Sequence, residues 1–217
     1  MLSARALGSF LLLSAVLPAG AQKQLTQASA AARYKELATK VRSGDLNIDW
    51  REFRLDAALG EVSQGFDSQP VHVQVVDDLD AGRYEKALAE SQTVIDHNMA
   101  FGEGHLLAMT VLQKMGKVDE ASKEEAILNA IGKSIMDSGD GSSAATAWFT
   151  VMPSETVFFL TEALGAEITD HELVRVNGHA YNKLTVLDRQ KKKRVVWFNT
   201  DTNELLKERA LHPESTQ

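Results

Sequence analysis

The sequence predicts an α+β protein, in which antiparallel helical hairpins precede a helix packed on an antiparallel sheet of about four strands. Three observations predict this class. A short motif recurs at the spacing of a helical repeat, the apolar pattern changes from helical to alternating near residue 138, and an Asn-Gly pair separates two alternating segments. The predicted organisation is a leader at 1–21, a helical region at 22–137 and an α+β domain at 138–217.

The first segment has the pattern of a secretory signal peptide. Arg5 precedes an apolar run over residues 7–17, shorter than the roughly 20 residues of a membrane-spanning helix. Pro18 breaks the helix, and the small residues 19–21 form a cleavage pattern. We therefore expect a secreted chain, periplasmic or extracellular, that begins at Gln22 and keeps no transmembrane segment. A retained anchor is the alternative.

The composition excludes several classes of site. The 217 residues carry a formal net charge of −7 and include no cysteine, so disulfides, thiolate metal sites and a cysteine nucleophile are all excluded. The acidic balance argues against a nucleic-acid partner. The basic cluster at 190–194 lacks interleaved aromatic residues that could stack on bases, so we interpret it as a charged hairpin turn. A nucleic-acid or lipid-headgroup contact is the alternative.

Two helices are expected before the repeated motif. Residues 22–41 are rich in alanine and have helical apolar spacing. Asp49 lies three residues before Glu52, which is the spacing of a capping box for a helix that begins at Trp50. Residues 60–70 are predicted as a loop from their Gly, Ser, Gln and Pro content. The residues of the second helix that we expect to face the core are Trp50, Phe53 and Leu55.

The repeated motif predicts two helical hairpins. Residues 82–87, Gly-Arg-Tyr-Glu-Lys-Ala, recur 34 positions later as Gly-Lys-Val-Asp-Glu-Ala at 116–121. This period, with a small residue at the same place, is typical of tetratricopeptide-like hairpins. Each glycine directly follows a predicted helix, where the backbone often takes a left-handed conformation that glycine adopts at little cost. The predicted helices are 71–82, 84–97, 102–115 and 118–135.

The repeats are degenerate. Ser91 and Glu125 stand where a large aromatic residue is usual, and Met99 stands where a proline is usual, so we predict at most two repeats. Hairpins of this kind usually bind proteins or peptides. The partner contacts that we assign by position alone are Arg83, Glu90, His105 and Gln113.

The C-terminal part is predicted as β-α-β-β-β. Asn177-Gly178 is the preferred pair for a type I′ hairpin turn, and Gly165 is expected to end the helix. The helix is expected to be capped by Ser154 and to end at Leu164. The predicted strands are 146–152, 172–176, 180–187 and 194–199.

Adjacent aromatic residues raise a packing question. Phe158 and Phe159 cannot face one side of a helix, and neighbouring strand residues such as Trp197 and Phe198 point to opposite faces. Some of these side chains therefore face away from the helix–sheet core. Either the helical hairpins cover that second face, which we favour because a chain without disulfides needs burial, or it is an exposed surface for a partner.

A glycine-rich segment marks the boundary between the two parts. It consists of Ser138, Gly139, Asp140 and Gly141. A calcium loop would need oxygen ligands at alternate positions, but Gly139 and Gly141 occupy those positions. We predict a tight turn in which Asp140 accepts nearby backbone amides and the glycines take positive φ.

Three segments together resemble a known family. They are residues 48–55 (Ile-Asp-Trp-Arg-Glu-Phe-Arg-Leu), the Ser-Gly-Asp-Gly turn at 138–141 followed by Thr-Ala-Trp at 146–148, and Trp-Phe-Asn at 197–199. In this order they resemble the secreted bacterial proteins of domain-of-unknown-function family 4919. The resemblance covers nearly the whole chain after the leader. It implies secretion and these fold boundaries, and it implies no activity.

No catalytic or metal motif stands out. The six histidines include no His-x-x-x-His pair. His171 and His179 could meet across the predicted hairpin and hold a metal, but solvated edge positions are the interpretation that we prefer. The segment 60–65 has its serine one place too late for a nucleophile elbow. The histidines are His72, His97, His105, His171, His179 and His212.

We therefore predict a secreted, non-catalytic binding protein with no cofactor, which engages an unidentified protein or peptide through its helical repeats. The alternative is a hydrolase-type enzyme or metal-binding protein with a cleft between the two parts. Convergence of Asp140, His171 and His179 in one pocket would favour that alternative. A structural envelope component is a third interpretation. Ligand, biological process and oligomeric state do not follow from these residues.

Overall fold

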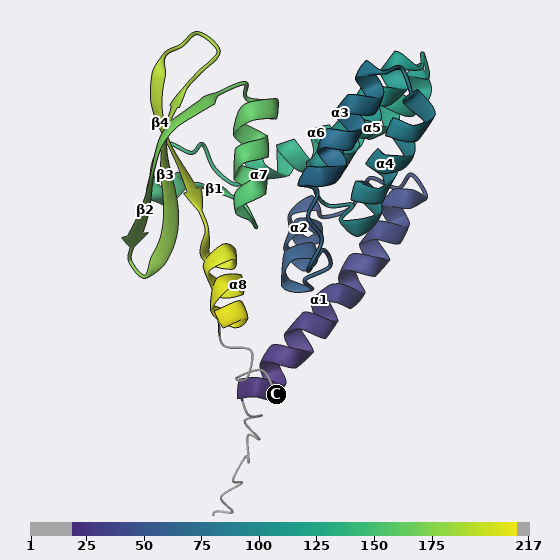
Figure 1. Ribbon diagram of the computed structural model, residues 1–217. Helices are drawn as coiled ribbons and strands as arrows, with labels where there is room; N and C mark the ends of the chain where they lie inside the picture. Colours follow the sequence, from purple (N-terminus) through teal and green to yellow (C-terminus); the bar gives the residue numbers. More distant parts are fainter. Residues whose placement is uncertain (1–18, 212–217) are drawn as a thin grey trace, which may run out of the picture.

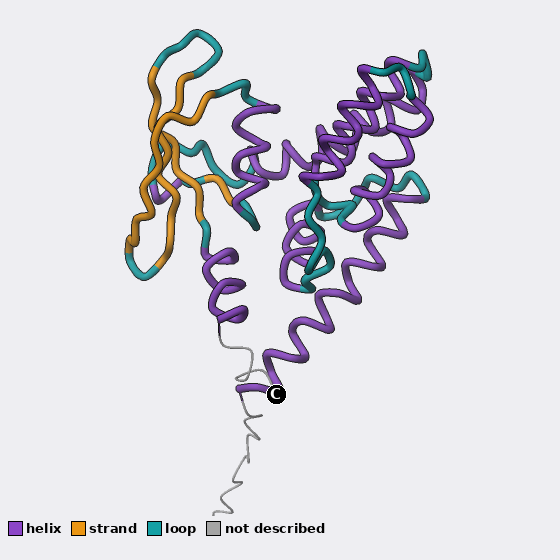
Figure 2. The backbone as a smooth tube through the Cα atoms, viewed as in Figure 1, coloured by secondary structure: helices purple, strands orange, loops and turns teal. Residues whose placement is uncertain are grey.

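Six helices precede a four-stranded sheet within residues 19–211, the part of the chain that this computed structural model describes (Figure 1). The class is α+β, as predicted. Residues 1–18, which hold most of the predicted leader, lie outside the described residues. The helical part and the sheet form two arms that meet near α2 and the end of α6, as the backbone trace in Figure 2 shows. None of the described helices combines the length and apolar character that crossing a bilayer demands.

The helices of the first part lie close to their predicted positions. α1 packs against α2, the helices from α3 to α6 each pack against the next along the chain, and α2 also contacts α6. The α3 helix begins two residues earlier than predicted, because Pro70 occupies its first turn, where a missing N–H costs no hydrogen bond. The bounds are α1 (Ala19–Arg42), α2 (Trp50–Leu59), α3 (Gln69–Asp80), α4 (Tyr84–His97), α5 (Gly102–Lys114) and α6 (Val118–Met136).

The two predicted hairpin turns have the same geometry. Gly82 and Gly116 have φ angles of 71° and 73°, in the left-handed region that glycine tolerates. The N–H that follows each glycine donates to the carbonyl five residues back, at 2.8 Å for Arg83 and 2.9 Å for Lys117. This is the Schellman arrangement that ends a helix. The recurring motif therefore corresponds to a recurring structure, in which α3–α4 and α5–α6 are equivalent antiparallel pairs.

The sheet is mixed, which corrects the prediction of a wholly antiparallel sheet. Its order is β1-β4-β3-β2, and β1 pairs with β4 in parallel. Asn177 and Gly178 both have positive φ, as a type I′ turn requires, so the predicted hairpin is confirmed. The strands are β1 (Trp148–Phe149), β2 (Glu167–Val176), β3 (His179–Leu187) and β4 (Lys193–Asn199). The first strand is thus much shorter than the predicted 146–152, because Ala144–Thr146 forms a 3₁₀ turn instead.

The helix beside the sheet differs from the prediction in its start and its winding. α7 (Pro153–Phe158) has Met152 as its N-cap residue, and Ser154 makes no cap. It continues as a π-helical turn, η2 (Phe159–Ala163), whose wider winding lets Phe159 and Leu160 both reach the core. Their neighbours in that core include Ile135 from the end of α6. Gly165 follows with a φ of 61°, as expected.

The two faces of the sheet are covered differently. Phe198 packs with Phe159 in the core, so Trp197 and Val195 point to the opposite face. The helical hairpins lie on the α7 side in Figure 1, so the favoured prediction that they cover the second face is wrong for these two residues. Val195 is 46% exposed. Phe149 does meet the helical part, since the guanidinium of Arg51 lies 4.7 Å from its ring.

A last helix, α8 (Asp201–Leu211), was not predicted. Its apolar pattern is weak, and it is held by side-chain contacts with distant residues. Asp201 accepts the amide of Ala180 at 2.7 Å and contacts Nδ1 of His179 at 2.7 Å. These contacts tie the start of α8 to the hairpin, and α8 also packs against α2.

The α2 helix carries buried charges that the sequence pattern did not reveal. Asp49 caps it as predicted, because its Oδ1 accepts the Glu52 amide at 3.0 Å. Leu55, expected to face the core, is only half-buried. Arg54 and Asp56 are fully buried instead. Charged side chains are rarely buried unless they are paired, so each needs a partner from outside α2.

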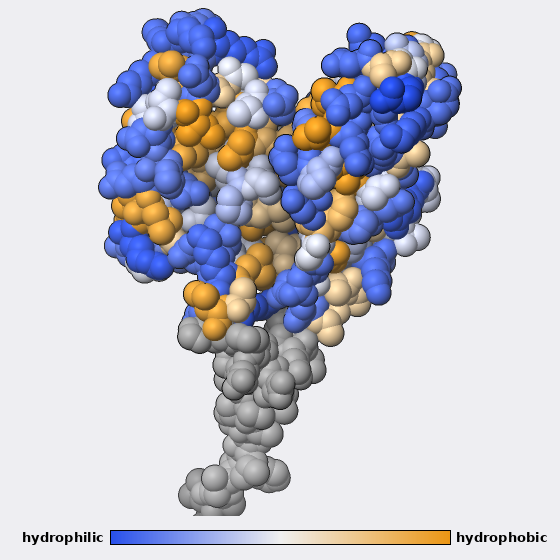
Figure 3. Space-filling view, viewed as in Figure 1, coloured by the Kyte–Doolittle hydropathy of each residue, from blue (hydrophilic) through white to orange (hydrophobic). Residues whose placement is uncertain are grey.

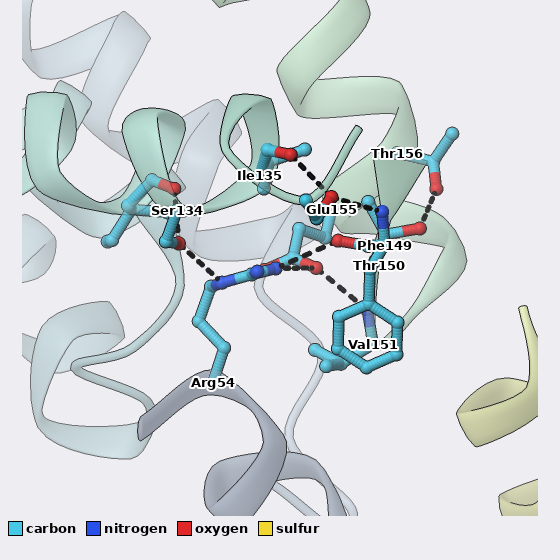
Figure 4. A network of polar contacts seen from close by, with 10 residues as sticks. Arg54, Ser134, Ile135, Phe149, Thr150, Val151, Glu155 and Thr156 are labelled. Carbon is cyan, nitrogen blue, oxygen red and sulfur yellow. Dashed lines mark hydrogen bonds and ion pairs between the residues drawn. The ribbon is translucent and has the colours of Figure 1, made fainter. Parts of the chain in front are cut away.

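Both buried charges find such partners. On one side of α2, Asp56 forms a two-pronged ion pair with Arg33 of α1, at 2.5 and 3.0 Å. On the other side, Nη1 of Arg54 lies 2.8 Å from Oε2 of Glu155 on α7, and its Nε donates to Oγ of Ser134 on α6 at 3.0 Å (Figure 4). Oε2 of Glu155 also accepts the Val151 amide at 2.8 Å. One side chain thus joins α2, α6 and α7.

This junction predicts a measurable coupling. Arg54→Met should lower the free energy of unfolding by about 3–5 kcal/mol, because it leaves the Glu155 carboxylate buried without its partner. In the double variant Arg54→Met/Glu155→Gln the buried charge is gone and the new amide oxygen still accepts the Val151 amide, so part of the loss should be regained. Urea unfolding of both single variants and the double variant measures the coupling. Single losses below about 1 kcal/mol would contradict a buried pair of this kind.

Candidate functional site

A cleft of about 530 Å³ lies between the two helical hairpins and α7. One wall consists of residues near the starts of α3 and α5, and the other consists of α7 with η2. Figure 3 shows apolar surface on both sides of the opening between the two arms. The lining residues are Ser68, Gln69, His72, Phe101, Glu103, Leu106, Leu107, Ser154, Val157, Phe158, Thr161 and Glu162.

The two leading helices present equivalent positions to this cleft. Gln69 and His72 of α3 correspond, 34 residues later, to Glu103 and Leu106 of α5. Residues three or four apart share one face of a helix. The stacked repeats therefore turn the same face of each leading helix toward α7.

Aromatic side chains form the apolar part of the cleft. The rings of Phe101 and Phe158 meet edge to face, with centroids 5.8 Å apart. Phe158 packs so closely on the first turn of α5 that a Cβ on Gly102 would lie 2.5 Å from its ring. Phe159 points into the sheet core instead, so the two adjacent rings divide between the cleft and the core. Val157, next to them, is 48% exposed.

The carboxylate of Glu103 orients the polar side chains of the cleft. Glu103 accepts the hydroxyl of Ser68 at 2.7 Å and contacts Nδ1 of His72 at 2.9 Å. An ionised carboxylate only accepts hydrogen bonds, so Nδ1 carries a proton, and in the neutral ring Nε2 is an acceptor. The His72 side chain is 40% exposed and that of Glu103 only 15%, so the imidazole is the more accessible group.

This arrangement suits hydrogen bonding rather than nucleophile activation. Ser68 and His72 both bond to Glu103, and the serine does not donate to the histidine, as an activated nucleophile would. The charged residues lining the cleft are Glu103 and Glu162, together with the titratable His72; neither lysine nor arginine is among the lining residues. The cleft therefore offers an apolar floor, hydrogen-bonding groups and a negative potential.

Apolar surface continues from the cleft along α3. Val76 lies one turn beyond His72, and Val73 one turn beyond Gln69, so these residues extend the same helix face. They are 41% and 51% exposed. Adjacent exposed valines rimmed by polar groups are typical of an interaction surface.

None of the four partner contacts assigned from the sequence lines this cleft. Arg83 forms an ion pair with the buried Asp78 across the hairpin turn. Oε1 of Glu90 lies 3.4 Å from Nζ of Lys86, one turn away on α4. Gln113 is exposed near the end of α5.

The His105 side chain is buried, and it lines a separate cavity of about 730 Å³ among α1, α4, α5 and α6. Its Nδ1 lies 2.6 Å from Oε2 of Glu124 and its Nε2 lies 2.9 Å from the Met99 carbonyl. The ring thus connects α5 to α6 and to the end of the first hairpin. A single histidine on an apolar helix carries no sequence signal that distinguishes such a buried contact from an exposed one.

The residues proposed for enzyme or metal chemistry do not converge. His171 lies opposite Leu184 in the sheet, five positions along β3 from His179, and His179 contacts Asp201. Asp140 belongs to a turn beside β4, where the carbonyl of Gly141 accepts the Trp197 amide. Within the described part of the chain, no group of three or more His, Asp or Glu side chains is arranged to hold a metal ion.

Ser138, Gly139, Asp140 and Gly141 lie in a turn between α6 and β1. Asp140 accepts the Ser142 amide at 2.9 Å and the Thr146 hydroxyl at 2.6 Å. Gly141 has a φ of 67°, whereas Gly139 does not take positive φ as predicted. Gly139 is required for space instead, since a Cβ there would lie 2.3 Å from the Thr146 carbonyl oxygen.

No family model, curated protein or solved structure matches this chain. The resemblance to domain-of-unknown-function family 4919 therefore stays a prediction, as does the kinship of the hairpins with tetratricopeptide repeats. The functional argument rests on the geometry of the cleft.

The turn predicts a pH-dependent contribution to stability. Hydrogen bonds from Thr146 and Ser142 lower the pKa of Asp140 to about 2, below the value of about 3.9 in an unfolded chain. A carboxylate with a lowered pKa stabilises the fold above its unfolded pKa and loses this effect as the pH falls through its folded pKa. Asp140→Ala should therefore lower the melting temperature at neutral pH.

The difference from the unsubstituted protein should shrink below about pH 5 and vanish only below the folded pKa of about 2, near pH 1. Chemical unfolding over this pH range measures it. Asp80→Ala, which removes an exposed carboxylate, is the control and should show a much smaller change. A pH-independent difference for Asp140→Ala would show that its charge is not what stabilises the turn.

Proposed function

We propose that this chain is a non-catalytic binding protein that holds a peptide segment of a partner protein in the cleft between the helical hairpins and α7. The observation that carries this proposal is the shared face of α3 and α5, where equivalent positions of two stacked hairpins meet an apolar wall on α7. Helical hairpins create extended concave surfaces of this kind for partner segments. The proposal keeps the class of function that the sequence predicts and places it on different residues.

The partner segment should be apolar and basic. Phe101, Phe158 and Val157 offer apolar contact, and Val73 and Val76 extend it along α3. The carboxylates of the cleft face no lining lysine or arginine, so a lysine or arginine of the partner would complement their charge. An amphipathic helix with a basic face has this composition and fits the mode in which a helix occupies a groove.

The walls of the cleft are held before any partner arrives. Glu155 sits on α7, only two residues before Val157, and its ion pair with Arg54 ties this wall to α2 and α6. A preorganised cleft costs less conformational entropy on binding than one that must first assemble. The rigid junction thus supports selective binding of a short segment.

Secretion and a periplasmic or extracellular location remain part of the proposal. They rest on the leader pattern, most of which lies outside the described residues. The absence of cysteine is compatible with an oxidising compartment, because the core holds the fold without disulfides.

The alternative of a hydrolase-type or metal-binding protein has one supporting feature in the cleft, the carboxylate-oriented imidazole of His72.

Two sets of synthetic peptides test the proposal. Both have the same amphipathic apolar pattern, but the charged positions are all lysine in one set and all glutamate in the other. Fluorescence anisotropy with the full chain should show binding of the lysine set only. Val157→Glu should weaken this binding about tenfold or more, because it places a charge among apolar contacts.

Matched variants make the result specific. Val195 is exposed to nearly the same degree as Val157 but lies on the other face of the sheet, so Val195→Glu should leave binding unchanged. Glu162→Lys should weaken binding, and Glu125→Lys on the exposed face of α6 should not. Equal binding of the two peptide sets, or equal losses in Val157→Glu and Val195→Glu, would refute the proposed site.

A further inference from the structure

The sheet has one long free edge, which is strand β2. Within residues 19–211, β2 pairs with β3 alone and stands last in the sheet order (Figure 1). The opposite edge is β1, which has only 2 residues. A short edge strand offers little backbone to another chain, whereas the 10 residues of β2 offer a row of N–H and C=O groups. The edge of β2 is therefore where a further strand could join the sheet.

The pairing register shows which groups of β2 face outward. The carbonyl of Ala180 accepts the Thr200 amide on the β4 side of β3. Hydrogen bonds alternate in direction along an antiparallel strand, so Asn182 and Leu184 also direct their N–H and C=O groups toward β4. The β2 residues opposite these three therefore point their backbone groups away from β3. They are His171, Leu173 and Arg175.

The His171 amide agrees with this direction. It donates to Oδ1 of the neighbouring Asp170 at 2.9 Å, and not to β3. The register is regular from His171 to Val176, because the irregularity of this strand lies earlier, between Ile168 and Asp170. The regular segment thus presents outward backbone groups at every second residue, which is the spacing at which another strand presents its own.

A groove lies beside this edge, on the face of the sheet that carries α7. Its volume is about 620 Å³, and it runs over β2 and β3 between α7 and α8. The side chains of His171 and Leu173 line the groove, and both residues have outward backbone groups. Leu173 is 50% exposed, and Pro153 and Val157 of α7 add apolar surface. Because side chains alternate along a strand, a strand added to β2 would direct every second side chain into this groove.

We propose that β2 accepts an extended segment of a partner protein as a fifth strand of the sheet. The outward groups of β2 select an extended chain, because main-chain hydrogen bonds along a sheet edge require a second strand. The groove beside them would accept the apolar side chains of that segment. This surface is distinct from the cleft proposed for a helical segment, and either proposal can fail alone.

Charge favours a basic segment. The side chains of β2 include three carboxylates and one guanidinium. Glu172 pairs with Lys183 of β3 at 3.3 Å, whereas Asp170 bonds only to the His171 amide among the described residues. A lysine opposite Asp170 would supply the missing charge, since opposite charges on facing strands stabilise the pairing. The segment should therefore alternate apolar residues, which face the groove, with basic residues, which face the other side of the sheet.

A second copy of this chain is the competing occupant of the edge. Two β2 strands paired edge to edge would each bring three carboxylates and one guanidinium, and the whole chain has a formal net charge of −7. Like charges on facing strands destabilise the pairing. The acidic edge is therefore better matched by a basic partner than by itself.

Alternating peptides of about seven residues, the length of an ordinary strand, test the proposal. Fluorescence anisotropy with the full chain should show binding of a leucine–lysine peptide, and a leucine–glutamate peptide should bind at least about tenfold more weakly. N-methylation then tests the backbone bonds. The N–H groups of an added strand face β2 and solvent in alternation, so methylating one alternate set should abolish binding and methylating the other should not.

Two variants at one position separate the side chain from the backbone. Leu173→Ala removes apolar contact in the groove and should weaken binding severalfold. Leu173→Pro also removes the outward N–H without breaking a bond to β3, and it should weaken binding about fivefold or more beyond Leu173→Ala. Asp170→Lys should weaken binding of the lysine peptide, whereas Asp80→Lys, which makes the same change of net charge at an exposed position of α3, should not.

These variants assign the binding to one surface. Leu173 and Asp170 line the groove and not the cleft, whereas Val157 lines both. Equal binding of the two peptides, equal effects of the two methylated sets, or a chain that dimerises through β2 and binds neither peptide would overturn the proposal. If Leu173→Pro does not fold, as judged by its circular dichroism spectrum, the methylated peptides and the other two variants still decide the matter. An unchanged affinity in both Leu173→Ala and Asp170→Lys would show that the peptide does not bind at β2.

Discussion

The buried ion pair between Arg54 and Glu155 is the contact on which the arrangement of the two parts depends. It places a full positive charge where water does not reach, so the geometry around it must satisfy that charge closely. Ser134 and the Phe149 carbonyl accept further hydrogen bonds from Arg54, while its Nη2 has no partner among the described residues, and α2, α6, β1 and α7 meet around one guanidinium. On the opposite side of α2, Asp56 pairs with Arg33, so this short helix is held from both sides.

The proposed peptide cleft lies where the helical part meets the C-terminal part. It needs α3 and α5 on one side and α7 on the other, so neither part could form it alone. Because the junction determines the position of α7, the width of the cleft follows from the ion pair and from the packing of Ile135 into the sheet core.

Much of the fold could be predicted from local sequence patterns. The hairpin wall of the candidate cleft was not predicted, although the same repeat would have allowed it. The 34-residue repeat predicted the hairpins, and the same offset applied to the helix starts would have aligned Gln69 and His72 with Glu103 and Leu106. The 34-residue offset does not predict the opposite wall of the cleft, which α7 forms. Val157 and Phe158 reach the cleft only through the tertiary packing of α7 against the hairpins.

The sequence by itself determined the α+β class, the four helices of the hairpins, the Asp49 cap, the Asn177-Gly178 turn and the turn around Asp140. Each of these depends on contacts between residues close in the chain, so their pattern is local. Only the tertiary structure decided the parallel pairing of β1, the burial of Arg54 and His105, and the cleft between the hairpins and α7. These depend on partners tens of residues away, such as Glu155 for Arg54, and no local pattern encodes which distant side chain will meet a buried charge.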